Sequence, residues 1–238
     1  MIVRLYGGYA VTVFAVVALL VLIIVAVMPG LRRRRQVARC GARAIFRLCG
    51  ISIDYGELAT LPTEPCVVVA NHASYIDGVL LCALLPPRFG FVIKREVTRA
   101  PLVHLLLRRI GAYFVERHNR QAAASDTRSL LRAAGAGQSL AVFPEGTFQA
   151  DAGLLRFRAG AFAAAVAGRR PVVPVTIQGA RDILPAGVWL PRPGQLRVRV
   201  FPQIACEGEG RTEMQRLARA SRAVFLRHLD EPDLTAST

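Results

Sequence analysis

The sequence predicts an α/β fold in which a largely parallel central sheet is flanked by helices. After residue 50, short runs rich in β-branched and aromatic residues alternate with helical stretches of about ten residues or more. This alternation is typical of parallel strands joined by crossover helices. Prolines lie in the connections between these expected elements, and the sequence contains no internal repeat. With 238 residues, the chain is long enough for one substantial core.

The expected elements follow one another along the chain after residue 50. The strand candidates are Cys66–Ala70, Phe89–Ile93, Ala112–Val115, Ser139–Phe143, Val172–Ile177 and Leu196–Phe201. The helix candidates are Ser74–Leu85, Pro101–Ile110, Ala122–Ala134, Gly160–Ala167 and Glu213–His228. The polar tail Asp230–Thr238 is expected to be frayed.

The first part of the chain is more apolar than the rest. Hydrophobic residues make up 53% of the sequence and the mean hydropathy is +0.37. Residues Tyr9 to Met28 are almost entirely apolar, and about 20 such residues span a bilayer core, so we predict a membrane helix here. A signal peptide is the alternative. The length of the run, and Pro29-Gly30-Leu31 before four arginines, make a poor match to a cleavage site.

Arginines follow the apolar run directly. Arg32 to Arg35 predict that the rest of the chain lies on the cytoplasmic side of an inner or plasma membrane. Residues 33–50 have apolar side chains at helical spacing with arginines between them, as in an amphipathic helix on anionic lipid headgroups. A surface helix packed on the domain has the same pattern. The sequence leaves open whether residues 9–28 cross the bilayer or enter one leaflet as a helical pair with 33–50.

The charge balance limits the possible partners. The net charge is +15, which suits anionic membrane lipids or an anionic substrate. No nucleic-acid-binding motif is present, and a membrane anchor argues against a nucleic-acid partner. The five cysteines form no CxxC pair and the four histidines no ligand pattern. We therefore expect no metal and no cofactor, and we expect reduced cysteines.

The segment after the first buried strand candidate carries a possible acid–base pair. His72 is suited to act as a general base because its pKa ordinarily lies near neutrality. Asp77, five residues on, could fix the imidazole tautomer and stabilise the imidazolium. Ser74 and Asp77 also fit a capping box, in which the carboxylate would only cap the following helix. The two interpretations are compatible.

A second group of residues suits the binding of an anion. Phe143-Pro144-Glu145-Gly146-Thr147 runs from a strand candidate into a turn that offers backbone N–H groups and a hydroxyl. A plain β-turn is the alternative. Arg158 lies just before a helix candidate, where it could hold a phosphate or be ordinary surface charge. Lys94, the only lysine, and Arg117 each follow a strand candidate, at the sheet edge where ligands usually bind.

Together these blocks resemble the glycerolipid acyltransferase family, the PlsC-like enzymes that include lysophosphatidic acid (1-acyl-sn-glycerol-3-phosphate) acyltransferases. The resemblance runs from about Pro65 to Phe201. It comprises NHxxxxD at Asn71–Asp77, Lys94 with Arg117, FPEGT at Phe143–Thr147, and Val172–Val175. NHxxxxD followed at this distance by FPEGT is a specific pair of motifs. We therefore expect a membrane anchor with an interfacial helix in residues 1–50 and an acyltransferase domain in residues 51–238.

The resemblance implies direct acyl transfer from acyl-CoA or acyl carrier protein to a lysophospholipid acceptor. That acceptor would be the sn-2 hydroxyl of 1-acylglycerol-3-phosphate, and the product would be phosphatidic acid for phospholipid biosynthesis. It also implies that His72 is the general base and that Asp77 orients it. Val172–Val175 would contribute to the acyl side of the site. The implied substrate-binding residues are Asn71, Lys94, Arg117, Glu145, Gly146, Thr147 and Arg158.

Two positions depart from the family pattern. His104 stands where many members have glycine, and Phe148 stands where an Arg or a Ser-containing run is common. Because Phe148 removes a possible cation, a different acceptor is the main alternative, such as a lyso-ornithine lipid or another lysophospholipid. A non-catalytic lipid-binding protein is a further alternative, but it has no need of the intact set of motif residues.

Overall fold

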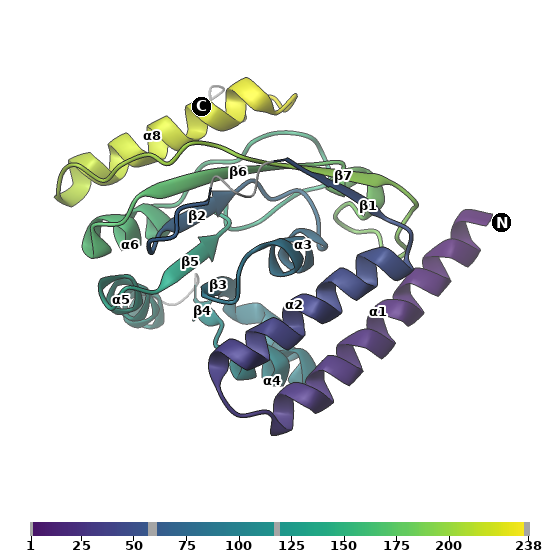
Figure 1. The fold of residues 1–238 in the computed structure, drawn as a ribbon. Helices are drawn as coiled ribbons and strands as arrows, with labels where there is room; N and C mark the ends of the chain where they lie inside the picture. The colour runs from purple at the N-terminus through teal and green to yellow at the C-terminus, as the bar shows by residue number, and fades with distance from the viewer. Residues whose placement is uncertain (1, 57–60, 117–119, 236–238) are drawn as a thin grey trace.

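The structure is a computed structural model that describes residues 2–56, 61–116 and 120–235 (Figure 1). In this part of the chain, seven strands form one sheet in the order β1-β7-β6-β2-β5-β3-β4. The strands are β1 (Ser52–Tyr55), β2 (Val67–Ala70), β3 (Phe89–Lys94), β4 (Tyr113–Val115), β5 (Ser139–Val142), β6 (Val172–Gln178) and β7 (Gln195–Val200). The strands from β6 to β4 run parallel, which confirms the predicted largely parallel sheet.

The other edge of the sheet differs from the prediction. Strand β7 is antiparallel to β6, and β1 pairs parallel with β7. The chain returns from β6 through the short helix α7 (Ala180–Ile183) and a loop. This connection begins and ends at the same edge of the sheet, where Gln178 pairs with Arg197, so β7 runs antiparallel to β6. Strand β1 was not predicted because its four residues are mostly exposed and form no apolar run.

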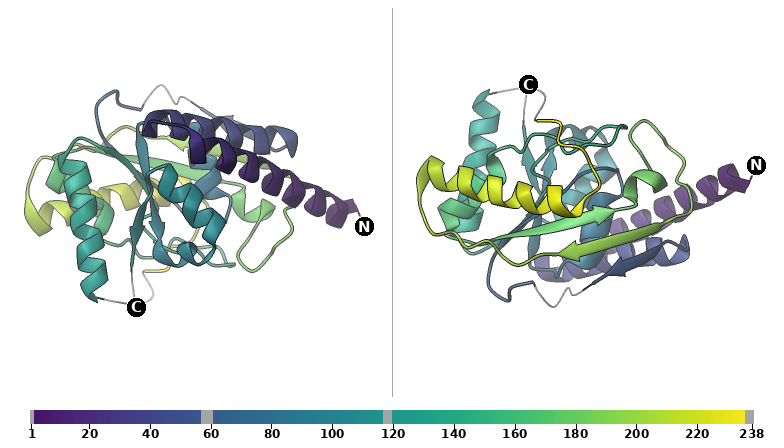
Figure 2. Two further views of the ribbon diagram at one scale, coloured as in Figure 1. Left: turned by 90° about the horizontal axis from the view of Figure 1, so that it is seen from below. Right: turned by 90° about the horizontal axis from the view of Figure 1, so that it is seen from above.

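Helices cover both faces of the sheet (Figures 1 and 2). Side chains alternate along β2, so Val68 and Ala70 join the core on one face, while Val67 and Val69 join the core on the other. The first core includes residues of α2 and α3, and the second includes residues of α5, α6 and α8. The longer helices are α1 (Ile2–Val27), α2 (Leu31–Leu48), α3 (Asp77–Leu84), α4 (Pro101–Arg109), α5 (Arg120–Gly135), α6 (Gly160–Gly168) and α8 (Gly210–His228).

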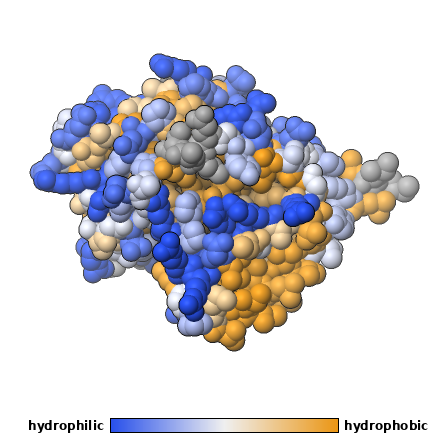
Figure 3. All heavy atoms as spheres, in the orientation of Figure 1, coloured by the Kyte–Doolittle hydropathy of each residue, from blue (hydrophilic) through white to orange (hydrophobic). Residues whose placement is uncertain are grey.

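Helix α1 lies along the domain. Among the described helices it alone is long and apolar enough to cross a membrane, judged by length and composition only. Near its start, the Tyr6 hydroxyl donates to the Cys49 carbonyl at 2.8 Å. Near its end, Arg109 Nε donates to the Val25 carbonyl at 3.1 Å. Because both ends contact the rest of the protein, the geometry favours a helical pair with α2. Apolar side chains gather over α1 beside a hydrophilic band along α2 (Figure 3).

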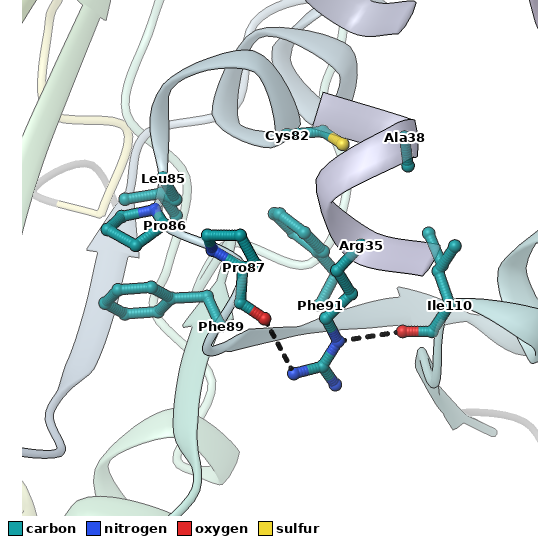
Figure 4. A pocket seen from close by; sticks show the side chains of 9 residues that line it. All are labelled: Arg35, Ala38, Cys82, Leu85, Pro86, Pro87, Phe89, Phe91 and Ile110. Carbon is teal, nitrogen blue, oxygen red and sulfur yellow. Dashed lines mark hydrogen bonds between the residues drawn. The ribbon is translucent and has the colours of Figure 1, made fainter. Parts of the chain in front are cut away.

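Helix α2 is packed on the domain by its arginines. Arg35 is only 6% exposed, and its guanidinium donates to the carbonyls of Ile110 at 2.9 Å, Arg88 at 3.1 Å and Gly111 at 3.2 Å. Figure 4 shows Arg35 reaching from α2 towards Ile110 and Pro87, beside a small cavity at the amino end of β3. Within the predicted basic cluster, Arg35 is therefore a structural residue.

Two more arginines of α2 bind the end of α3. Arg39 Nη2 donates to the Leu84 carbonyl at 3.0 Å, and Arg43 Nε donates to the Ala83 carbonyl at 2.8 Å. Cations at a helix carboxyl end satisfy free carbonyls and complement the helix dipole. The alternative of a helix packed on the domain is thus the observed one. Contact between α2 and lipid headgroups stays a prediction.

The expectation of a frayed tail at Asp230–Thr238 is wrong for residues 230–235. The Leu154 backbone N–H donates to the Pro232 carbonyl at 2.9 Å. Arg222 of α8 forms an ion pair with Asp233 and also donates to the Leu154 carbonyl at 3.0 Å. These non-local bonds tie the tail to the loop that precedes α6, and a polar sequence gives no sign of them.

Candidate active site

His72 and Asp77 lie together at the carboxyl end of β2. Their Nδ1 and Oδ2 atoms are 2.8 Å apart. The Asp77 side chain is fully buried, whereas 18% of the His72 side chain is exposed. An ionised carboxylate only accepts hydrogen bonds, so Nδ1 carries the proton in this pair. The lone pair of Nε2 is then free to accept a proton from a substrate.

Asp77 also organises the chain before α3. Its Oδ2 accepts the backbone N–H groups of Ala73 at 2.7 Å and Ser74 at 2.8 Å. These bonds hold residues 73–76 in a turn, so α3 begins at Asp77 and not at Ser74 as predicted. The capping box is therefore not formed, because the cap position is Ile76 and no side chain caps the helix. Asp77 instead holds the turn and contacts His72 at once. The other oxygen, Oδ1, is buried and accepts no hydrogen bond from any described residue.

Asn71 is bonded within the sheet, and its role as a substrate ligand stays a prediction. The side chain is 3% exposed. Its Nδ2 donates to the Ile177 carbonyl at 2.9 Å, and its Oδ1 accepts the Ile177 backbone N–H at 2.7 Å. The amide thus extends the pairing of β2 with β6 by one residue. It holds the start of the His72 loop against the sheet.

Glu145 is likewise buried, at 3% exposed, and its role as a substrate ligand also stays a prediction. Its Oε1 accepts the His72 backbone N–H and its Oε2 accepts the Leu155 backbone N–H, both at 2.8 Å. Burial raises the pKa of the Glu145 carboxyl to about 7, against the opposing effect of these two bonds. Glu145 therefore joins the two sequence motifs through a backbone bond to the candidate base.

The turn after β5 has the conformation that its glycine predicts. The Gly146 N–H donates to the Phe143 carbonyl at 3.0 Å, and Gly146 has a φ of 73°. A side chain is disfavoured at such a φ. Thr147 follows it, half-buried. The plain β-turn is therefore observed, and the binding of an anion by Gly146 and Thr147 stays a prediction.

The predicted cations lie in different surroundings. Lys94 is the last residue of β3 and is half-buried. Arg158 is exposed two residues before α6, and its backbone N–H donates to the Pro144 carbonyl at 2.8 Å. Arg117 lies outside the described residues. The ends of β3, β5 and β2 meet at one edge of the sheet, so Lys94 and Arg158 remain candidates for the headgroup.

Val172–Val175 belong to the core. The valines of this segment are at most 1% exposed within β6. Strand β6 lies beside β2, and both faces of the sheet are covered by helices. The segment therefore supports the sheet beneath the site, and the described structure gives no exposed surface there for the predicted acyl contact.

Aromatic rings next to His72 were missed in the sequence. The His72 ring stacks on Phe143 with centroids 4.2 Å apart and planes at 16°. Phe148 contacts the same imidazole at 4.5 Å and 54°. Tyr75 in turn lies edge-on to Phe148 at 4.8 Å. Phe143 and Phe148 could have been found from the FPEGT motif itself, since Phe143 is its first residue and Phe148 follows its last.

Arg181 is a second residue that the sequence did not indicate. Its Nη1 donates to the carbonyls of Gln149 and Asp151, each at 2.7 Å, and its Nη2 contacts both carboxylate oxygens of Glu231 at 2.9 Å. The loop after Phe148 is thereby held by α7 and the tail. No local pattern marks this role, because the partners are 30 or more residues away.

Within the described part of the chain, no group of three or more His, Cys, Asp or Glu side chains could hold a metal ion. The five cysteines form no disulfide in the described structure, and their reduced state stays a prediction. Burial raises the pKa of the Cys66 and Cys82 thiols to about 11. A raised pKa keeps both groups in the thiol form at neutral pH.

The sequence profile of the family described as Acyltransferase matches residues 52–178, more than half of the chain. The chain belongs to the acyltransferase family. The family match contains the His72–Asp77 pair and the Glu145 turn, and it ends at the last residue of β6. It therefore covers every strand of the sheet except β7.

Two curated acyltransferases illustrate the relationship. A putative 1-acyl-sn-glycerol-3-phosphate acyltransferase of Caenorhabditis elegans is 30% identical over 76% of this chain and 65% of its own length. The 1-acyl-sn-glycerol-3-phosphate acyltransferase of Saccharomyces cerevisiae is 27% identical over 71% of this chain and 57% of its own length. The chain thus spans less than two thirds of either acyltransferase.

A solved structure has the same fold. The crystal structure of the 1-acyl-sn-glycerophosphate acyltransferase PlsC from Thermotoga maritima superposes with a TM-score of 0.76 at 24% identity. The match covers 95% of this chain and 92% of that acyltransferase. It therefore extends the shared fold beyond the family profile to nearly the whole chain, including most of the helical pair α1–α2.

Proposed function

We propose that this acyltransferase moves a fatty acyl group from acyl-CoA or acyl carrier protein to the sn-2 hydroxyl of 1-acylglycerol-3-phosphate. The product would be phosphatidic acid. The observation that carries this proposal is the 2.8 Å contact between His72 Nδ1 and the buried Asp77 Oδ2 at the carboxyl end of a parallel strand. The names of the relatives from worm and yeast support the choice of acceptor.

In the proposed reaction, His72 acts as general base. Its Nε2 accepts the proton of the acceptor hydroxyl while that oxygen attacks the thioester carbonyl. Asp77 holds the Nδ1–H and stabilises the imidazolium. The tetrahedral intermediate then collapses with cleavage of the C–S bond, and the thiolate takes the proton back from His72. The chemistry requires no cofactor beyond the thioester and no covalent acyl-enzyme.

The acceptor's phosphate is proposed to lie beside the turn after β5. The Gly146 N–H is used within the turn, but Thr147, with its N–H and hydroxyl groups, lies at the same sheet edge as the exposed Arg158 and the half-buried Lys94. Such a combination of N–H and hydroxyl groups with cations suits a phosphate monoester. Arg117, two residues after the end of β4, is assigned to the same headgroup by the family resemblance.

We further propose that residues 1–50 are the membrane part and residues 51–238 the catalytic domain. Helix α1 contacts the domain at both ends, so it would enter one leaflet together with α2. Arg32 to Arg34 would then lie among the anionic headgroups of the cytoplasmic leaflet of the inner or plasma membrane. Protease protection of the domain in sealed vesicles of known orientation tests this placement.

The decisive test of the proposed function is an acceptor panel with one acyl thioester. We expect the highest kcat/KM with lysophosphatidic acid, compared with lysophosphatidylcholine, a lyso-ornithine lipid and a neutral monoacylglycerol. Absence of transfer to every acceptor, from CoA and from acyl carrier protein, would reject the proposal. Arg117→Ala should raise the KM for lysophosphatidic acid and leave the KM for the thioester unchanged.

Another lysophospholipid acceptor is the second candidate. Phe148 occupies a position where a cation would favour a phosphate monoester, and it covers the imidazole instead. The Drosophila melanogaster relative named lysophosphatidylcholine acyltransferase is 31% identical over 63% of this chain. A preference for lysophosphatidylcholine in the panel would support this candidate.

A further inference from the structure

The chain's single tryptophan is displayed on an apolar loop. Trp189 is 80% exposed and its neighbour Leu190 is 41% exposed. The loop lies between α7 and β7, and residues 183–191 contain no charged side chain. Exposure of a large indole to water is unfavourable, and contact with an apolar partner surface would remove this cost.

The loop is a fixed structure and not a frayed segment. Its ends are closed by a hydrogen bond from the Arg192 backbone N–H to the Ile183 carbonyl at 2.9 Å, and Ile183 is fully buried. At its base, the Ser74 hydroxyl donates to the Leu184 carbonyl at 2.6 Å. Since Ser74 also donates its backbone N–H to Asp77, the loop is anchored directly to the active-site segment.

The loop lies against the first turns of α1. A Cβ placed on Gly7 would lie only 2.8 Å from Leu190 Cβ and 3.1 Å from the Pro191 carbonyl oxygen, so the glycine provides the close approach. Both views in Figure 2 show this light-green loop beside the amino-terminal half of α1. Tyr9 of α1, 51% exposed, lies near the same end. The apolar surface of α1 therefore continues into the loop.

A row of aromatic rings connects the loop to the candidate base. The Trp189 ring stacks over Tyr75 with centroids 6.2 Å apart and planes at 14°. Tyr75 contacts Phe148 at 4.8 Å, and Phe148 contacts His72 at 4.5 Å. The exposed end of this row is beside α1 and the other end is at the imidazole.

We propose that the loop 184–191 is a second bilayer contact, with Trp189 at the boundary between lipid headgroups and acyl chains. The inference rests on the proposed function, in which the substrate is a membrane lipid. Trp and Tyr favour this boundary because their rings are apolar and also carry one polar group. The occupant is a lipid bilayer because the loop continues the apolar face of α1, and the exposed Arg192 beside it suits anionic headgroups.

The contact would place the opening of the active site on the membrane surface. A lysolipid would then pass from the bilayer along Tyr75 and Phe148 to His72 without its acyl chain crossing water. This arrangement adds a role to Phe148 beyond the removal of a cation. It keeps the row of rings continuous between the surface and the base.

Intrinsic fluorescence tests the proposal directly, because Trp189 is the only tryptophan of the full chain. The protein is bound to phosphatidylcholine vesicles containing a minority of phosphatidylglycerol, and binding is verified by flotation. We expect a blue-shifted emission, protection from aqueous iodide, and stronger quenching by lipids brominated near the headgroup than by lipids brominated near the chain end.

A tryptophan on the other face of the sheet shows whether quenching by lipid is specific to the loop. Leu226 of α8 is 38% exposed, so Leu226→Trp combined with Trp189→Phe moves the indole away from α1. Its emission should be quenched by iodide and not by brominated lipid. Equal lipid quenching at both sites would contradict the proposal.

Wild-type acyl transfer in detergent micelles separates this inference from the proposed function. If the wild type transfers acyl groups normally in micelles but Trp189 on vesicles is quenched by iodide, the bilayer contact is overturned and the proposed function stands. Lipid quenching without any acyl transfer would overturn the function alone. Protection from iodide without quenching by brominated lipid would assign Trp189 to a protein–protein contact and overturn the proposal.

Discussion

The backbone N–H of His72 donates to Oε1 of Glu145 at 2.8 Å, although the two residues are 73 positions apart. This bond joins the two motifs of the family through a buried carboxylate. The second Glu145 oxygen accepts the Leu155 N–H, so the same side chain also fixes the loop before α6. The glutamate therefore serves as a positioning residue for His72, the candidate base.

Replacement of His72 by alanine should lower kcat by about 10²–10⁴-fold, because no described neighbour could replace the imidazole as general base. The measurement is thioester consumption by purified protein with lysophosphatidic acid. His228→Ala is the control, since His228 is exposed at the end of α8 and contacts only the Phe201 ring among the described aromatic side chains. Near-normal turnover of the His72 variant would reject its assignment as the base.

Asp77→Asn should lower kcat by about 10²-fold or more with little change in melting temperature. Asparagine can place its carbonyl oxygen where Oδ2 accepts three donors, and its amide where the unbonded Oδ1 lies. The turn before α3 would survive while the negative charge is lost. Rate and melting temperature are compared in the same preparation. A large drop in melting temperature with an unchanged rate would show that Asp77 only stabilises the turn before α3.

Glu145→Gln should lower the free energy of unfolding by about 1–3 kcal/mol, because a glutamine oxygen can accept only one of the two N–H groups at full strength. The pH dependence gives a second test. The pKa of Glu145 is about 7 in the folded protein, above its ordinary value of 4.5. Between these two pH values, the folded protein therefore binds the Glu145 proton more tightly than the unfolded chain does.

The stability that Glu145 contributes should therefore fall as pH rises from about 4.5 to about 7, and stay constant above. We expect this part of the pH dependence to be absent from the Gln variant. Denaturant unfolding in detergent from about pH 5 to about pH 8 compares the two proteins. Parallel pH curves would contradict the raised pKa.

Arg35→Met should lower the free energy of unfolding by about 2–4 kcal/mol, because several buried carbonyls would lose their donor. Those carbonyls belong to Arg88, Ile110 and Gly111 among others. Arg33→Met, on the exposed side of the same helix, should change stability by no more than about 0.5 kcal/mol. Equal effects of the two substitutions would indicate that Arg35 acts only through surface charge.

Much of the fold was predictable from local patterns. The strands β2, β5 and β6 are continuous runs of buried residues, and buried parallel strands are apolar on both faces. Strand β1 and the antiparallel direction of β7 were not predictable in this way. The former is a short exposed edge, and the latter depends on how the chain returns from β6 through α7.

The candidate site was also only partly predictable from local patterns. His72 and Asp77 are five residues apart, so residue type and spacing were enough to predict their pairing. Asn71 and Glu145 belong to the same motifs, yet their partners are Ile177 and the His72 backbone. These partners make them positioning residues, a role that the motif alone did not indicate.

The sequence by itself determined the family of this chain and the class of its fold, because motif spacing and strand patterning are local properties. Only the tertiary structure decided which basic and acidic residues are structural. Arg35 and Arg181 contact partners 30 to 76 residues away, and Glu145 contacts the His72 backbone 73 residues away, where no local pattern records the contact. The row of rings from His72 to Trp189 arises in the same way, since its members come together only when β2, β5 and the loop before β7 are assembled.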